Sequence, residues 1–251
     1  MKLCHVISIA LAGAILLTGP PRAFAGPGGL QGSYYILPGW HPDTNTGIDF
    51  SIVTGLVQNT LGPGGLPVAT PKAINGTGFS SGPFTNLNAN YEILWWVAGQ
   101  SGIVLEKVQN DLVPINQPTD FFPDGFTSNP PFRSVHWQGF FYAPDDGTAS
   151  FSLKADDDAW LFVNGSLALD DGGVKPMHTT SAVVSNLVGL TPGSLYTVDL
   201  FFADRHIRQS GIEFTSSVQL YPIPEPAFFQ MGALVAMSGL GLLRSRRSRN
   251  R

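Results

Sequence analysis

The chain has 251 residues, of which 43% are hydrophobic and only 13% are charged, and it contains 29 glycines and 20 prolines. Such a composition is too apolar for a disordered chain and too rich in glycine and proline for a helical one, so it favours short strands joined by turns. Residues 26–222 hold seven Lys and Arg against 17 Asp and Glu. This excess of negative charge argues against a nucleic-acid partner, because such a partner requires basic side chains on its phosphates.

The first 25 residues have the pattern of a secretory signal peptide. Met1-Lys2 is a short positive start, residues 6–17 are almost all apolar, and Ala23-Phe24-Ala25 is a small-residue cleavage site. We therefore expect a signal helix within residues 1–25 that is removed on export. Its removal takes away Cys4, the only cysteine, so disulfides, thiol catalysis and cysteine-ligated metals are excluded for the mature chain.

Residues 26–222 are predicted to form one domain built from strands. The first half is irregular, with strands expected at 32–37, 47–57, 91–97 and 102–108 and with long Gly- and Pro-rich loops at 59–90 and 111–131. The second half is regular, with strands expected at 134–142, 148–153, 159–163, 166–169, 179–187, 195–203 and 212–220. Several short strands at this spacing are typical of an antiparallel sandwich or barrel.

The strongest local signal is the dipeptide Asn164-Gly165, which lies between two apolar runs. A type I′ turn needs positive φ at both of its central residues, and Asn-Gly adopts that conformation readily. A two-residue turn pairs Val163 with Ser166 and, in a regular ladder, places Asp158 opposite Asp171.

That register gathers five carboxylates at the open end of the hairpin. They are Asp156, Asp157, Asp158, Asp170 and Asp171. Like charges facing each other across a ladder repel, so a compensating cation is expected. Calcium takes six to eight oxygen ligands from carboxylates, carbonyls and water, which makes it the candidate ion. The alternative is that these aspartates only end strands and turns, where Asp is common.

Several stretches of the second half occur in a characteristic order. They are Val135–Phe140, Asp146-Gly147, Asp156–Gly165, Asp171–Gly173 and Tyr196–His206. Together they resemble the fibro-slime domain of the protective-antigen-type β-sandwich superfamily. The resemblance implies an all-β fold, a single jelly-roll-like antiparallel β-sandwich with long loops. From the sugar-binding members of that superfamily it also implies that Asp156 and Asp157 hold calcium, which in turn coordinates sugar hydroxyls.

The function expected on these grounds is non-enzymatic. A glycosidase needs two carboxylates across a cleft, one of them with a raised pKa, and a run of adjacent aspartates does not by itself supply that arrangement. We expect a carbohydrate-binding or adhesion module with Trp40, Asp156 and Asp157 in the sugar site and a glycan or extracellular polysaccharide as partner. Two alternatives remain open: a structural matrix component without a sugar site, and a glycan hydrolase.

The C-terminal segment, residues 223–251, has three parts. Pro224-Glu225-Pro226 is followed by 17 uncharged residues, 227–243, and then by five arginines within the last eight residues. Arginines behind an apolar span hold that end in the cytoplasm. The order resembles the PEP-CTERM sorting signal of Gram-negative bacteria. It implies a transmembrane helix in the inner membrane, recognition of Pro224, Glu225 and Pro226 by an exosortase, and release to the cell surface or an exopolysaccharide matrix.

Overall fold

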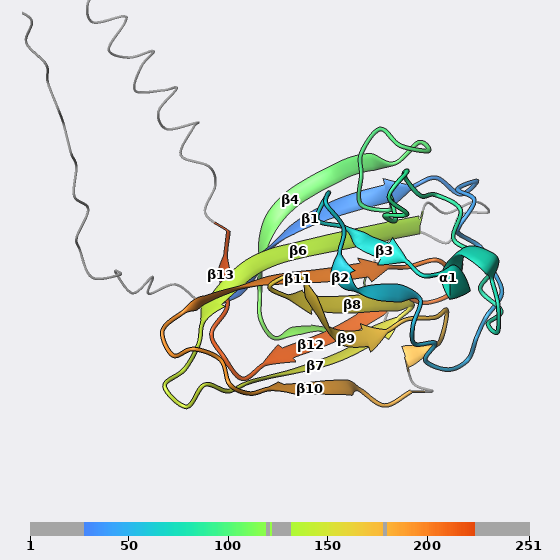
Figure 1. Cartoon of the computed structure of the whole chain (residues 1–251). Helices are drawn as coiled ribbons and strands as arrows, with labels where there is room; N and C mark the ends of the chain where they lie inside the picture. Colours follow the sequence, from blue (N-terminus) through green and yellow to red (C-terminus); the bar gives the residue numbers. More distant parts are fainter. Residues whose placement is uncertain (1–27, 119–120, 122–131, 178–179, 224–251) are drawn as a thin grey trace, which may run out of the picture.

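The computed structural model describes residues 28–118, 121, 132–177 and 180–223, which form an antiparallel β-sandwich of two sheets (Figure 1). The all-β prediction is therefore confirmed. The expected signal helix and the expected transmembrane helix at 227–243 lie outside the described residues. Within the described parts of the chain, no helix has the length and apolar character needed to cross a membrane.

The larger sheet has nine strands, and the smaller has four. In spatial order the larger sheet contains β3 (Pro67–Ala69), β2 (Val57–Leu61), β9 (Ser166–Asp171), β8 (Asp158–Val163), β11 (Leu195–Ala203), β6 (Phe132–Tyr142), β1 (Gly29–Leu37) and β4 (Val104–Leu112), with β13 (Tyr221–Pro222) beside β6. The smaller sheet contains β10 (Val183–Leu187), β7 (Ala149–Asp156), β12 (Gly211–Ser216) and β5 (Ile115–Gln117). β5 lies inside the segment 111–131 that was expected to be a loop.

The main core lies between the two sheets. Side chains alternate along a strand, so each strand turns every second residue toward the opposite sheet. Trp137 and Leu200 of the larger sheet and Phe151 and Phe214 of the smaller one are fully buried in this layer. β6 buries side chains on both faces from Phe132 to Trp137.

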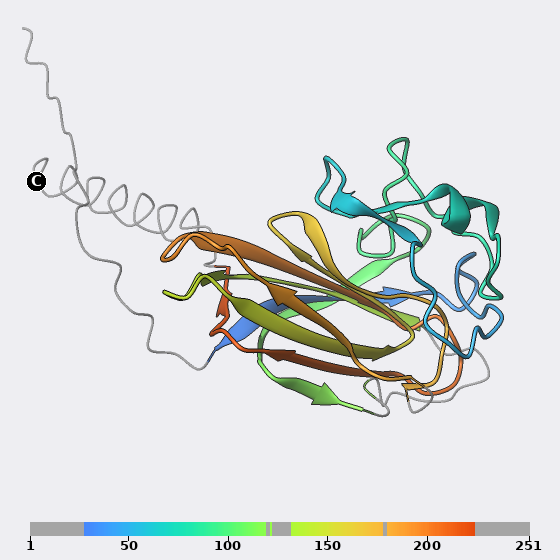
Figure 2. The same cartoon turned by 60° about the horizontal axis from the view of Figure 1, so that its bottom comes forward.

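A second core lies on the other face of the larger sheet, beneath a long insert between β1 and β4. We call residues 38–103 the insert; it contains β2, β3 and the short helix α1 (Pro71–Asn75) (Figure 2). The strands expected at 47–57 and 91–97 are wrong. A turn at Trp95 and Trp96 packs both indoles against Trp160 of β8. Successive side chains of a strand point to opposite faces, so a strand could not have placed both indoles against Trp160.

The central hairpin has the predicted turn and a different register. Asn164 and Gly165 have φ angles of 48° and 72°, and Val163 pairs with Ser166. A bulge on β9 then shifts the ladder, so that Leu161 pairs with Leu169. As a result Ala159, and not Asp158, lies opposite Asp171, and the predicted pairing of these two aspartates in the ladder is wrong.

The two ends of the sandwich are built differently. β1 and β11 finish, and β6 and β8 begin, at the end from which the insert emerges, which we call the insert end. The described chain starts at Gly28 and stops at Ile223 at the opposite end, where the Gly29 amide donates to the carbonyl of Leu220 at 2.9 Å. We call this the termini end.

Candidate functional site

The aspartate run Asp156–Asp158 lies where the chain crosses between the two sheets. β7 of the smaller sheet ends at Asp156, and β8 of the larger sheet begins at Asp158, so Asp157 alone makes the crossing. A direct crossing leaves no room for a solvated loop, and all three aspartates are buried. The run is therefore a packed part of the insert end and not an exposed turn.

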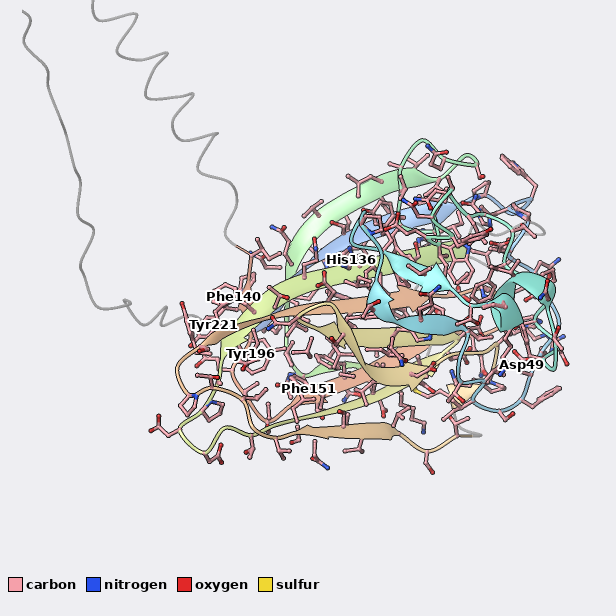
Figure 3. The ribbon with its side chains drawn as sticks, viewed as in Figure 1. Asp49, His136, Phe140, Phe151, Tyr196 and Tyr221 are labelled. Atoms are coloured by element: carbon pink, nitrogen blue, oxygen red, sulfur yellow. The ribbon has the colours of Figure 1, made fainter. Side chains whose placement is uncertain are left out.

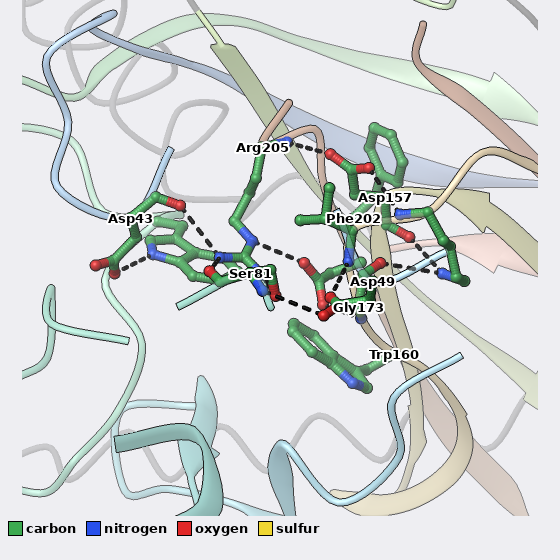
Figure 4. A network of polar contacts seen from close by, with 12 residues as sticks. Asp43, Asp49, Ser81, Asp157, Trp160, Gly173, Phe202 and Arg205 are labelled. Carbon is green, nitrogen blue, oxygen red and sulfur yellow. Dashed lines mark hydrogen bonds and ion pairs between the residues drawn. The ribbon is translucent and has the colours of Figure 1, made fainter. Parts of the chain in front are cut away.

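Two buried cations offset much of the predicted repulsion. Arg205 Nε lies 2.7 Å from Asp158 Oδ2, and Lys175 Nζ lies 3.3 Å from Asp171 Oδ1, with all four side chains fully buried (Figure 4). Lys175 Nζ also donates to the carbonyl oxygens of Asp157 and Asp171 at 2.8 and 2.9 Å. Buried charges of this kind require partners, because desolvation of an unpaired ion is costly.

Arg205 also fastens the insert to the sandwich. Its terminal nitrogens donate to the carbonyl of Asp43 at 3.2 Å and to Ser81 Oγ at 3.1 Å. The guanidinium lies 4.9 Å from the ring centroids of both Phe84 and Trp95, within the range of cation–π attraction. One side chain of the sheet thus contacts three separate parts of the insert.

Asp170 lies on the opposite face of β9 from Asp171 and binds the insert. Its carboxylate accepts hydrogen bonds from the Gly55 amide at 2.7 Å and from Trp160 Nε1 at 3.0 Å. Burial raises its pKa, while these donors lower it. The charge of Asp158 also raises this pKa, but the hydrogen bonds of Asp170 join it to the insert and to Trp160.

Asp156, Asp157 and Asp204 form a further group of carboxyl groups that interact electrostatically, and Asp204 is a residue that sequence reasoning missed. Asp157 accepts from the amides of Arg205 at 2.7 Å and Lys175 at 3.2 Å, and Asp156 accepts from Met177 at 3.4 Å. Asp204 is buried, and its Oδ1 has no hydrogen-bond partner among the described residues. β11 ends at Ala203, opposite Asp158, which places Asp204 beside the crossing.

Electrostatics links these three aspartates. Burial raises the pKa of Asp157 well above its ordinary value, and the charges of Asp204 and Asp156 add to the increase. Burial likewise raises the pKa of Asp204, with Asp156 adding to the increase and Arg133 opposing it. In the parts of the chain that the structure describes, no three His, Cys, Asp or Glu side chains are already arranged to hold a metal ion. The site is therefore rich in carboxyl groups whose ionisation burial disfavours, and an ion would need backbone, water or ligand oxygens as well.

We expect Asp204→Asn to gain stability over the parent protein as the pH rises from about 4, the ordinary pKa of an aspartate. A carboxyl group whose pKa is raised on folding loses stability as the pH rises through the folded pKa, because the folded state disfavours its charge. Thermal unfolding of both proteins in chelator at about pH 5 and about pH 7.5 measures this difference. Asp146→Asn, at an exposed carboxylate of the termini end, is the matched control. A stability difference for Asp204→Asn that does not grow with pH contradicts the electrostatic account.

Trp40 is 67% exposed and lies at the insert end, immediately after β1. β1 is three strands away from β8 in the larger sheet, which corresponds to about 14 Å at the usual strand spacing. Only a ligand longer than one sugar ring would reach both Trp40 and the pair Asp156 and Asp157. The three predicted sugar-binding residues therefore share one end of the sandwich but do not form one compact pocket.

Comparison with known proteins places this region in context. Residues 110–226 match the PA14 domain family, a segment that includes Asp156, Asp157, Asp158, Asp170, Asp171 and Asp204. Protein psiJ of Dictyostelium discoideum is 34% identical over 106 residues, covering 42% of this chain and 14% of psiJ. Protein psiQ of the same organism is 29% identical over 196 residues, covering 67% of this chain and 19% of psiQ. The chain thus spans less than a fifth of either relative.

Two of the solved structures that resemble this chain do so at low sequence identity and over most of its length. The PA14 domain of the MpAFP antifreeze protein is 13% identical with a TM-score of 0.32, over 79% of this chain and 93% of that domain. The Epithelial Adhesin 6 A domain of Candida glabrata, solved with Galb1-3GlcNAc, is 13% identical with a TM-score of 0.34, over 79% of this chain and 83% of that domain.

Proposed function

We propose that this chain, through its PA14-type β-sandwich, is an exported carbohydrate-binding or adhesion protein without enzymatic activity. The match of residues 110–226 supports the assignment, since PA14 domains typically serve as carbohydrate-binding modules in adhesins. The observation that carries it is the group Asp156, Asp157 and Asp204 at the insert end, which consists of three buried carboxyl groups and lacks a hydrogen-bond donor at Asp204 Oδ1 among the described residues. The sugar would bind there, with Trp40 contacting only a longer glycan.

Calcium is the ion we propose for this group. Carboxylate oxygens are the donors that calcium prefers, and Asp156, Asp157 and Asp204 fit that requirement. Of the other predicted ligands, Asp158 and Asp171 already pair with Arg205 and Lys175, and Asp170 binds the insert, so they position the site and do not contact the ion. When bound, calcium would supply positive charge and open coordination positions for sugar hydroxyls.

A calcium titration tests the ion separately from the sugar. A ligand present at 100 times its Kd adds about 2.7 kcal/mol to the free energy of unfolding, so calcium should raise the melting temperature measurably. The Asp157→Asn variant should show no such rise, while Asp146→Asn should behave like the parent. The absence of any shift at millimolar calcium would rule out the ion.

Glycan binding by the full chain tests the function. On a glycan array we expect calcium-dependent binding that chelator abolishes and that Asp157→Asn weakens at least about tenfold, a usual effect of disturbing a metal site. Asp146→Asn is again the control. A folded protein that binds no glycan supports a structural matrix component instead, and cleavage of polymeric sugars would support a hydrolase.

The ends of the chain support an extracellular location. We propose export by the signal peptide at residues 1–25, transient anchoring in the inner membrane by 227–243, and processing by an exosortase that recognises Pro224, Glu225 and Pro226. The destination would be the cell surface or the extracellular matrix of a Gram-negative bacterium. The excess of acidic residues in the body agrees with a calcium-rich extracellular setting.

A further inference from the structure

An uncovered apolar patch lies on the outer face of the larger sheet, where the insert stops. We define the outer patch as Phe140, Tyr142, Leu195, Tyr221 and Ile223. The rings of Phe140 and Tyr221 stack with centroids 5.5 Å apart, and Tyr142 packs edge-on against Phe140 at 5.7 Å. Tyr142, Leu195 and Ile223 are 42%, 47% and 39% exposed. Figure 3 shows Phe140 and Tyr221 at the opposite end of the molecule from Asp49 of the insert.

The position of the patch in the chain limits what can cover it. Ile223 is its last residue, and only Pro224, Glu225 and Pro226 separate it from the uncharged apolar segment 227–243. Four steps of an extended chain span at most about 14 Å. If segment 227–243 enters a bilayer, Ile223 must therefore lie within that distance of the lipid surface, with the rest of the outer patch beside it.

The chemistry of the patch suits such a surface. Tyrosine rings combine an apolar body with a polar hydroxyl and are enriched where membrane meets water. The seven Lys and Arg between residues 28 and 223 all lie toward the insert end, whereas Asp145 and Asp146 are exposed at the termini end. Attraction to acidic lipid headgroups therefore cannot position this end of the domain, and apolar contact must do so.

We infer that the outer patch docks the sandwich onto the surface of the lipid bilayer that holds segment 227–243, with the insert end pointing away from the membrane. This inference rests on the membrane anchoring included in the proposed function. It goes beyond that function because it orients the folded domain and assigns a role to five residues outside the carbohydrate site.

A fluorescence experiment on the full chain in phosphatidylcholine vesicles tests the docking. Cys4 is replaced by serine, and a polarity-sensitive fluorophore is attached to Leu195→Cys or, as control, to Ile207→Cys. The two positions are similarly exposed, at 47% and 42%, and lie at opposite ends of the sandwich. With a quencher attached to the lipid near its headgroup, the probe at position 195 should lose fluorescence, because an apolar group docked on a bilayer sits near the boundary of headgroups and acyl chains. The probe at position 207 should keep its fluorescence.

Each outcome separates docking from anchoring. Flotation with the vesicles shows whether the chain is inserted. An inserted chain with an unquenched probe at position 195 overturns the docking and leaves the anchoring intact, whereas a chain that does not float overturns both. Addition of phosphatidylserine should lessen the quenching, because Asp145 and Asp146 would be repelled; stronger quenching would contradict the apolar account.

Discussion

Replacing Arg205 with alanine should lower the free energy of unfolding by about 3–5 kcal/mol, the usual cost of removing one partner of a buried ion pair. The variant leaves Asp158 buried without its counter-charge and breaks the hydrogen bonds to Asp43 and Ser81. Denaturant unfolding followed by tryptophan fluorescence measures the loss. Limited proteolysis should show new cleavage within the insert, because Arg205 is a main link between insert and sheet.

Two comparisons separate the charge from other effects. Arg208→Ala, at an exposed position three residues further on, should change stability by less than about 0.5 kcal/mol. Combining Arg205→Met with Asp158→Asn should recover part of the loss, since no unpaired charge remains buried. An Arg205→Ala variant as stable as the parent would mean that the ion pair of Arg205 and Asp158 contributes nothing to the stability of the fold.

Replacing Trp160 with alanine should lower the free energy of unfolding by a similar amount, about 3–5 kcal/mol. The ring is fully buried between the larger sheet and the insert and contacts Phe84, Trp95 and Trp96 at centroid distances of 6.3–6.5 Å. Its loss opens a large cavity and removes the hydrogen bond to Asp170. Thermal and chemical unfolding measure the effect.

Trp40→Ala is the natural control, because it removes the same side chain from a position that is 67% exposed. Its effect on stability should stay below about 1 kcal/mol. If the two tryptophan variants unfold alike, the insert does not pack on the sheet as described.

The fold class could be predicted from the sequence because the signals for it, turns and short strands, each depend on only a few neighbouring residues. Asn164-Gly165 specifies its turn by backbone conformation alone, and the strands from 134 onward are separated by turn residues at regular intervals. The register of the hairpin was missed because a bulge at Ala168 depends on how β9 packs and not on the turn. The turn at Trp95-Trp96 was missed for a similar reason: an apolar run is compatible with a strand until the neighbouring surface is known.

The carboxylate site was predicted only in part. The sequence indicates that the carboxylates of Asp156–Asp158 repel nearby carboxylates. The basic side chains that offset this repulsion come from other elements of the fold. Arg205 lies 47 residues beyond Asp158, and the contact between them forms only because β8 and β11 are neighbours in the sheet. Asp204 was overlooked although a signal existed: it follows directly on a predicted strand that ends at 203. A comparison of the residues that follow the ends of neighbouring predicted strands would have identified Asp204.

The one-residue crossing at Asp157 also limits how this protein can diverge. Loops such as the insert tolerate changes in length, because their ends are fixed and their middle is free. Between β7 and β8 there is no such freedom. One residue more or less would turn every following side chain of β8 to the opposite face, moving Trp160 and Leu161 into each other's layers. Insertions and deletions should therefore accumulate in the insert during evolution, while the distance from Asp156 to Asp158 stays constant.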